Sequence, residues 1–123
     1  LLGRFEKERP SLPCICLNAD QAVLTAVGND YGYKHVFSRQ VSGLGVKGDV
    51  LLLLTTSGRS ENLAHAAAMA KTKGVISIAL SGRDGGTLWT DFQYLATGKT
   101  TAEIQESHLS ILHDVCRLID AEY

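Results

Sequence analysis

Apolar and polar positions divide the chain into strand-like and helix-like segments. Residues 50–55 are apolar at almost every position, which is typical of a strand covered on both faces. An alanine-rich segment of high helix propensity follows at 61–73 and ends at Gly74, a favourable helix C-cap. Residues 75–80 form a second apolar run. The middle of the chain therefore predicts a strand, a helix and another strand.

Weaker patterns precede this unit. A short strand is predicted at 13–18. A helix is expected at 21–28, with Asp20 as its N-cap and residues 28–30 as its end. A second amphipathic helix is expected at 33–44.

The last third of the chain predicts a loop at 81–86, an edge strand at 91–95 and a long helix that begins at Thr101. The expected apolar side of this helix comprises Ile104, His108, Ile111, Leu112, Val115, Leu118 and Ile119. Strands that alternate with helices predict an α/β fold with a doubly wound, mainly parallel sheet.

Composition fits one small domain. The chain has 123 residues, of which 45% are hydrophobic and 20% charged, so residues 1–123 are predicted to form a single domain. The net charge of −1 argues against a nucleic-acid or membrane partner, and the apolar run at 50–54 is too short to cross a bilayer. We expect no signal peptide at the start of the chain. Cys14, Cys16 and Cys116 lie in apolar patterns and are predicted to be reduced, buried residues of a cytoplasmic protein.

Hydroxyl side chains gather where the first apolar run meets the following helix. Thr55, Thr56, Ser57 and Ser60 lie within six residues of one another, with Gly58 among them. Capping the helix explains one hydroxyl, Ser57 or Ser60, but not four. Backbone N–H groups and the helix dipole favour an anion at such a junction, and glycine allows close approach. The pattern predicts a site for a sugar phosphate or a similar anionic metabolite.

Asn29 and Asp30 follow the first predicted helix and allow two interpretations. They can simply cap the helix and form a turn. Alternatively, because ligands of doubly wound sheets bind near loops and helix ends, Asp30 could bind sugar hydroxyls or act on a proton.

The final helix carries Gln105, His108 and His113. The rise from Gln105 to His113 is about 12 Å at roughly 1.5 Å per residue, so the two cannot easily bind one metal from a single continuous helix. A shared site would require a distorted first turn or sites shared between subunits. Each histidine can equally be a packed or surface residue.

Other polar residues receive simpler interpretations. His35 and His65 are expected at exposed helix positions, and residues 83–86 are expected to form a tight turn. Basic side chains near the start of the chain are expected to form a solvated face rather than to meet an anion; they are Arg4, Lys7 and Arg9.

Several stretches, in order along nearly the whole chain, together carry a resemblance to a known family. They are Gly3-Arg4-Phe5, residues 8–13, 24–33, 36–41, 48–52, Thr56-Ser57-Gly58 with Ser60, residues 82–86, and Ile104-Gln105-Glu106 with His108. In these stretches the chain resembles the sugar isomerase (SIS) superfamily and, within it, the phosphoheptose isomerases.

The resemblance implies a flavodoxin-like fold and an isomerase that converts sedoheptulose 7-phosphate to a glycero-manno-heptose 7-phosphate through an enediol, the entry step to lipopolysaccharide heptose. It also implies a cytoplasmic homotetramer with active sites between subunits and one zinc ion per subunit. The family's phosphate loop falls on Thr55, Thr56, Ser57 and Ser60, and its substrate pair falls on Asn29 and Asp30. Gln105 corresponds to a residue that binds substrate and metal, and His113 corresponds to the acid/base histidine and a second metal ligand.

The chain also departs from the family pattern. Thr55 replaces the first serine of the loop but keeps the hydroxyl, and Arg59 stands where asparagine is usual and could add phosphate affinity. The family's first helix, first strand and the histidine and glutamate that complete its catalytic site would precede Leu1. The resemblance therefore predicts an SIS domain that is incomplete at its N-terminus.

Two other functions remain open. The chain is also similar to a non-enzymatic SIS relative that binds the bacterial replication initiator as a tetrameric scaffold, but that relative carries a non-titrating residue at the position of His113. A phosphosugar-binding module is the third possibility. His113 is the feature that favours catalysis over the scaffold function, whereas the phosphosugar-binding module is the weaker option because such sensor domains usually come attached to a DNA-binding segment.

Overall fold

The computed structural model describes all residues from Leu1 to Tyr123. Three strands form one parallel sheet in the order β1-β2-β3, with β1 at Val50–Leu54, β2 at Ile76–Gly82 and β3 at Phe92–Ala96. Leu54, the last residue of β1, lies beside Leu80 of β2. The strands therefore end at the same edge of the sheet, where loop residues from different parts of the chain can meet.

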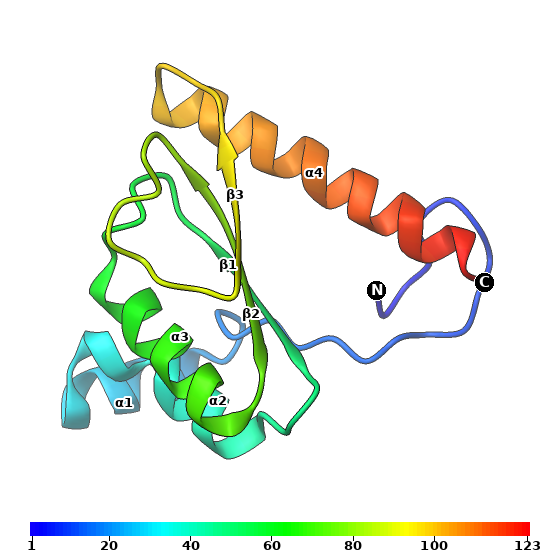
Figure 1. Cartoon of the computed structure of the whole chain (residues 1–123). Helices are drawn as coiled ribbons and strands as arrows, with labels where there is room; N and C mark the ends of the chain where they lie inside the picture. The colour runs from blue at the N-terminus through cyan, green and yellow to red at the C-terminus, as the bar shows by residue number, and fades with distance from the viewer.

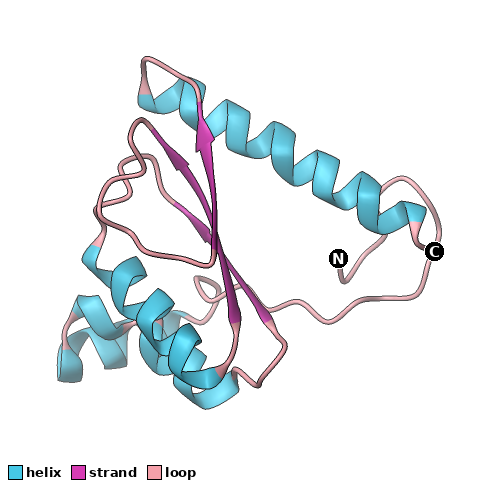
Figure 2. Cartoon of the chain, viewed as in Figure 1, coloured by secondary structure: helices cyan, strands magenta, loops and turns pink.

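Helices cover both faces of the sheet (Figure 1). α3 packs on β1 and β2, and α2 packs on α3, whereas α4 packs on β2 and β3 from the other side. Figure 2 shows the same three layers by type of element. The helices are α1 (Gln21–Tyr31), the short 3₁₀-helix η1 (Tyr33–His35), α2 (Ser38–Leu44), α3 (Glu61–Lys73) and α4 (Thr101–Ala121). The predicted doubly wound parallel sheet is confirmed.

The core lies between the sheet and α3. Leu53 of β1 and Ala79 of β2 pack against Ala66 and Ala67 of α3, where small side chains let the helix approach the sheet closely. Val36, just after η1, is fully buried in the same cluster. This packing fixes the junction between β1 and α3, which carries the predicted phosphate loop.

Local sequence sets the helix ends. The Asp20 carboxylate accepts a hydrogen bond from the Val23 N–H at 3.0 Å and caps α1 as predicted. α3 ends at Gly74, whose φ of 71° is the left-handed conformation that glycine adopts without strain. α4 begins with a reciprocal capping box between Thr100 and Glu103.

The prediction that β1 is covered on both faces is wrong for this chain. Leu53 faces α3 and is buried, whereas Val50, Leu52 and Leu54 on the opposite face are 58%, 40% and 47% exposed. That face is open because α4 lies over β2 and β3, not over β1.

Residues 13–18 do not form the predicted strand. They have no sheet partner, and a turn bond from the Ala19 N–H to the Cys16 carbonyl ends the segment. Cys14 and Cys16 are exposed and Cys116 is half-buried, so the prediction of three buried cysteines is also wrong, although all three are free thiols. Alternating apolar residues give a strand only when another strand supplies hydrogen-bond partners.

Several predicted boundaries also shift. α1 continues through residues 28–30 to Tyr31, because Gly28 is tolerated inside the helix and lies against Val36. The helix predicted at 33–44 is divided into η1 and α2. β2 extends into the predicted loop as far as Gly82, and the turn begins at Arg83.

The apolar side of α4 is buried mainly at its N-terminal end. Ile104 and His108 are buried against the sheet, but Val115 and Leu118 are 41% and 69% exposed. Past the sheet, the helix has no neighbour on that side except the start of the chain. No helix of the structure is both long enough and apolar enough to cross a membrane.

The first twelve residues, here called the N-terminal strap, run beside the C-terminal end of α4, so that the two ends of the chain lie close together (Figure 1). Arg9 is buried and forms an ion pair of 2.8 Å with the buried carboxylate of Asp120. The same carboxylate accepts hydrogen bonds from the Glu6 and Lys7 N–H groups at 2.9 and 3.0 Å. The expectation of a solvated basic face is therefore wrong for Arg9.

Candidate functional site

The loop after β1 is organised by its own hydroxyl groups. Thr55 is buried, and its Oγ1 accepts a hydrogen bond from the Gly58 N–H at 3.1 Å. Ser57 Oγ accepts a weaker bond from the Arg59 N–H at 3.3 Å. Ser60 occupies the N-cap position of α3 but makes no capping hydrogen bond with its side chain. Its hydroxyl and the first N–H groups of α3 remain available to an anion.

A second loop holds this one in place. The Gly58 carbonyl accepts hydrogen bonds from the N–H groups of Thr87 and Leu88, both at 2.9 Å. A Cβ atom on Gly58 would collide with the backbone of Gly85, and Gly58 has a φ of 64°. Glycine is therefore required at this position both for conformation and for close backbone approach.

Arg59 has an anionic partner within the chain. Its guanidinium contacts the Asp84 carboxylate at 2.8 Å, and both side chains are more than half exposed. The Gly86 N–H and then the Arg59 charge lower the pKa of Asp84 below its usual range. The predicted tight turn at 83–86 is confirmed, with the Gly85 N–H bonded to the Gly82 carbonyl at 3.0 Å. Arg59 thus ties the hydroxyl loop to this turn.

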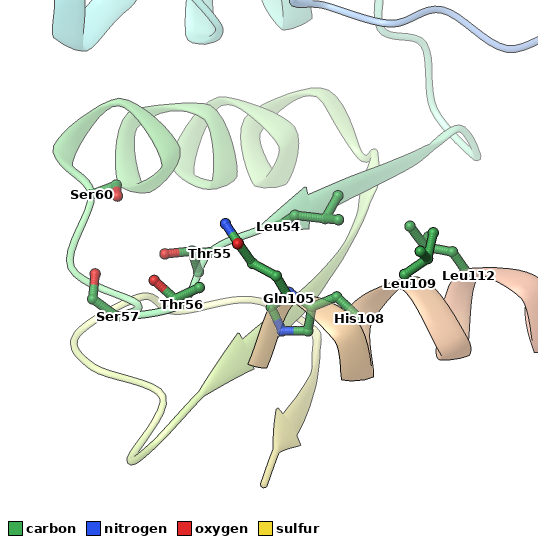
Figure 3. A pocket seen from close by; sticks show the side chains of 9 residues that line it. All are labelled: Leu54, Thr55, Thr56, Ser57, Ser60, Gln105, His108, Leu109 and Leu112. Carbon is green, nitrogen blue, oxygen red and sulfur yellow. The ribbon is translucent and has the colours of Figure 1, made fainter. Parts of the chain in front are cut away.

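A pocket of about 400 Å³ lies between the hydroxyl loop and the N-terminal half of α4 (Figure 3). Nine residues line it: Leu54, Thr55, Thr56, Ser57, Ser60, Gln105, His108, Leu109 and Leu112. Its volume lies in the range typical of small-molecule sites. The structure therefore brings together five of the predicted site residues, namely Thr55, Thr56, Ser57, Ser60 and Gln105.

His108 is a pocket residue that the sequence analysis did not assign to the site. It is 3% exposed, and its Nε2 lies 3.1 Å from the carbonyl oxygen of Ser81. The available signal was its spacing of three residues from Gln105, which places both side chains on one face of a helix.

His113 is not among the residues that line this pocket. It is exposed, and its imidazole stacks on the ring of Phe5 from the strap, with ring centroids 5.6 Å apart. The Cζ atom of Arg117, one turn further along α4, lies 6.0 Å from the centroid of the same Phe5 ring, and its Nε lies 3.4 Å from the Glu6 carboxylate. The strap therefore contacts the helix face that carries His113.

Asn29 and Asp30 are also separate from the pocket. Both lie in the last turn of α1 and not in a loop after it, so the predicted loop position is wrong. They are exposed, and the Asn29 amide donates a hydrogen bond of 2.9 Å to the Asp30 carboxylate. Their predicted contact with a substrate stays a prediction.

His35 and His65 were expected at exposed positions but are half-buried against each other. Their ring centroids are 4.7 Å apart, and His65 Nε2 lies 3.9 Å from Glu61. The contact arises because η1 packs on α3.

Comparison with known proteins agrees with the geometry of this site. A model of the SIS domain family matches residues 1–82, two thirds of the chain. The chain belongs to the SIS domain family. The resemblance stated from the sequence is thereby confirmed.

Individual SIS relatives are similar over almost the whole chain. A phosphoheptose isomerase from Halorhodospira halophila is 50% identical over 98% of this chain, and one from a Nitratiruptor species is 49% identical over all of it. The solved structure of a phosphoheptose isomerase from Francisella tularensis is 44% identical, with a TM-score of 0.94 over 98% of the chain. A second solved structure, from Neisseria gonorrhoeae, has a TM-score of 0.82.

The chain spans less than the full length of these SIS proteins. It covers 63% of the Halorhodospira protein and 66% of the Francisella chain. The site described above is therefore the part of an SIS site that residues 1–123 build.

The residues of this SIS domain do not by themselves fit the zinc ion that the resemblance implies. No group of three or more histidine, cysteine, aspartate or glutamate side chains is placed to hold a metal ion. Gln105 lines the pocket, whereas His113 lies eight residues further along the helix and contacts Phe5. Two such residues fall short of the four ligands of a usual zinc site.

Proposed function

We propose that this chain is the greater part of an aldose–ketose isomerase that interconverts sedoheptulose 7-phosphate and glycero-manno-heptose 7-phosphate in the cytoplasm, within lipopolysaccharide heptose synthesis. The observation that carries the proposal is the pocket between the hydroxyl loop and Gln105, in a chain similar to proteins named phosphoheptose isomerase. A sugar phosphate needs hydrogen-bond donors around its phosphate group, and both donors and acceptors along its hydroxylated carbon chain.

The hydroxyl loop would bind the phosphate. Thr56, Ser57 and Ser60 offer hydroxyl donors, and the N-terminus of α3 offers free N–H groups and the positive end of its dipole. Thr55 would hold the loop, because its hydroxyl oxygen accepts a hydrogen bond from the Gly58 N–H, and its O–H could still donate to the phosphate.

His113 would move the proton in this reaction. Isomerisation through an enediol removes a proton from the carbon beside the carbonyl and returns one to the neighbouring carbon. Histidine suits this exchange because its unperturbed pKa lies near neutral pH. His113 does not line the pocket of its own chain, so the reaction is proposed to take place at a site shared between subunits of a homotetramer, where Asn29 and Asp30 would also reach substrate.

If zinc binds, Gln105 and His113 would be its two ligands from this chain. These two residues alone do not complete a zinc site.

The test uses the full-length protein and sedoheptulose 7-phosphate. We expect His113→Ala to abolish both conversion and the exchange of substrate hydrogen with D₂O, measured by NMR, because both need the acid/base group. Ser110→Ala, an exposed change on the same helix, is the matched control and should retain both activities.

Unchanged turnover in His113→Ala would remove the role proposed for this residue. A wild-type protein that neither converts sedoheptulose 7-phosphate nor exchanges its hydrogen, but captures the replication initiator, would instead favour the scaffold function.

A further inference from the structure

His108 is a buried histidine within the pocket whose two ring nitrogens have different surroundings. Its Nε2 lies 3.1 Å from the Ser81 carbonyl oxygen. Nδ1 makes no hydrogen bond within the chain, and it is not sealed from solvent. Because His108 lines the pocket, the pocket is the space that Nδ1 can reach.

The Ser81 carbonyl determines which nitrogen carries the proton. A carbonyl oxygen can accept a hydrogen bond but cannot donate one, so Nε2 must be the N–H donor. In the neutral ring Nδ1 then has a lone pair and acts as an acceptor. Ser81 itself is fully buried in β2, so this contact is fixed by the sheet.

An acceptor is useful to only one end of a sugar phosphate. A phosphate dianion presents acceptor oxygens, which a second acceptor would repel. A sugar hydroxyl can donate to Nδ1. The donors of the hydroxyl loop lie on the opposite wall of the pocket from α4 (Figure 3).

We propose that His108 is a substrate-specificity residue whose Nδ1 accepts a hydrogen bond from a hydroxyl of the sugar chain, with Ser81 holding the ring in the required tautomer. This inference rests on the proposed function, because it takes a sugar phosphate as the ligand. Gln105, three residues earlier on the same helix face, would contact the same end of the sugar.

Two amide variants test the roles of Nδ1 and Nε2 separately. In His108→Gln the longer side chain can place its NH₂ near the position of Nε2 and keep the bond to Ser81, but it loses the acceptor at Nδ1. In His108→Asn the shorter amide oxygen lies near the position of Nδ1, but the bond to Ser81 is lost. Each variant is made in the full-length protein.

For His108→Gln we expect the KM for sedoheptulose 7-phosphate to rise about tenfold, since one hydrogen bond to the substrate is lost. Inhibition by inorganic phosphate should stay unchanged, because the proposed phosphate contacts are those of the hydroxyl loop and do not include His108. His108→Asn should lower the melting temperature more than His108→Gln and raise KM less.

Three outcomes would overturn the inference. If wild-type protein converts the sugar phosphate and His108→Gln retains the wild-type KM, His108 is a structural residue while the proposed function stands. The same conclusion follows if KM rises in step with the loss of melting temperature in both variants. A wild-type protein that shows neither turnover nor binding of sedoheptulose 7-phosphate would overturn the proposed function and this inference together.

Discussion

The hydroxyl loop is held to the loop beside it mainly by backbone contacts, whereas the C-terminal end of α4 is held to the strap mainly through one side chain of the helix, the Asp120 carboxylate. In the loop, Gly58 bonds to Thr87 and Leu88 through main-chain atoms. At the end of α4, Asp120 gathers Arg9 and two backbone N–H groups of the strap. The contact between the loops requires that residue 58 has no side chain, and the contact of α4 with the strap requires the Asp120 carboxylate. Different substitutions should therefore break each.

The largest effect is expected from Gly58→Ala. The new Cβ would collide with Gly85, and alanine is strained at a φ of 64°. Together these effects should destabilise the protein by about 2–5 kcal/mol and misplace the phosphate-binding groups. Urea unfolding and the affinity for inorganic phosphate measure the two consequences.

Gly43→Ala is the matched control for this change. Gly43 lies within α2, and nothing is within 4 Å of a Cβ placed there. Alanine should therefore leave phosphate affinity unchanged and stabilise the helix by up to about 1 kcal/mol. Equal behaviour of the two alanine variants would contradict the tight contact between the loops.

Asp120→Ala should have the next largest effect. It leaves the buried Arg9 guanidinium without its counter-charge and removes the acceptor for the Glu6 and Lys7 N–H groups. We expect the melting temperature to fall by about 10 °C and trypsin to cleave after Arg4 and Lys7 much faster.

Asp114→Ala controls for the loss of a carboxylate on α4. Asp114 forms an exposed ion pair with Arg117 at 2.7 Å, and such pairs contribute little to stability. Its melting temperature and trypsin cleavage should stay close to those of wild type. Slow cleavage of the strap in Asp120→Ala would show that other contacts hold it.

Acid should weaken the strap in the same way. The Lys7 N–H, the Arg9 side chain and the Glu6 N–H lower the pKa of Asp120 to about 2, below the value of about 3.9 for a free aspartate. The unfolded chain therefore takes up the proton first, and the stabilisation is complete above about pH 4 and lost as pH falls toward 2. Urea midpoints between pH 5 and 2.5 should fall less steeply in Asp120→Asn than in wild type. Parallel profiles would contradict this assignment.

Contacts between residues close in the sequence could be predicted, whereas contacts between distant residues could not. The hydroxyl loop, α3 and its end at Gly74 could be predicted because strand, hydroxyls, glycine and helix are contiguous. The contact of Arg9 with Asp120 joins residues 111 positions apart, and no local pattern marks it. The position of His108 on the same helix face as Gln105 could be predicted from their local spacing. Its orientation could not, because the Ser81 carbonyl that orients the ring belongs to β2.

The missed elements share another cause. The strand predicted at 13–18 and the second covered face of β1 both need neighbours that residues 1–123 do not supply. Apolar periodicity reports that a face is suited to burial, but not what buries it. The same reason explains why α4 was predicted to have a long apolar side, although beyond His108 its apolar residues are half-buried or exposed.

The smallest effect is expected from Phe5→Leu, which keeps an apolar side chain in the strap but removes the ring beside His113. Aromatic stacking contributes about 0.5–1.5 kcal/mol, so a less well oriented imidazole should reduce kcat about threefold with little change in KM. Phe5→Tyr should restore the rate, and Phe92→Leu, which removes an exposed ring on β3, should not alter it. NMR adds a readout independent of turnover, because loss of the ring current should move the His113 imidazole proton signals. If those signals stay in place, Phe5 does not orient His113. The strap would then act on α4 only through the contacts of Asp120.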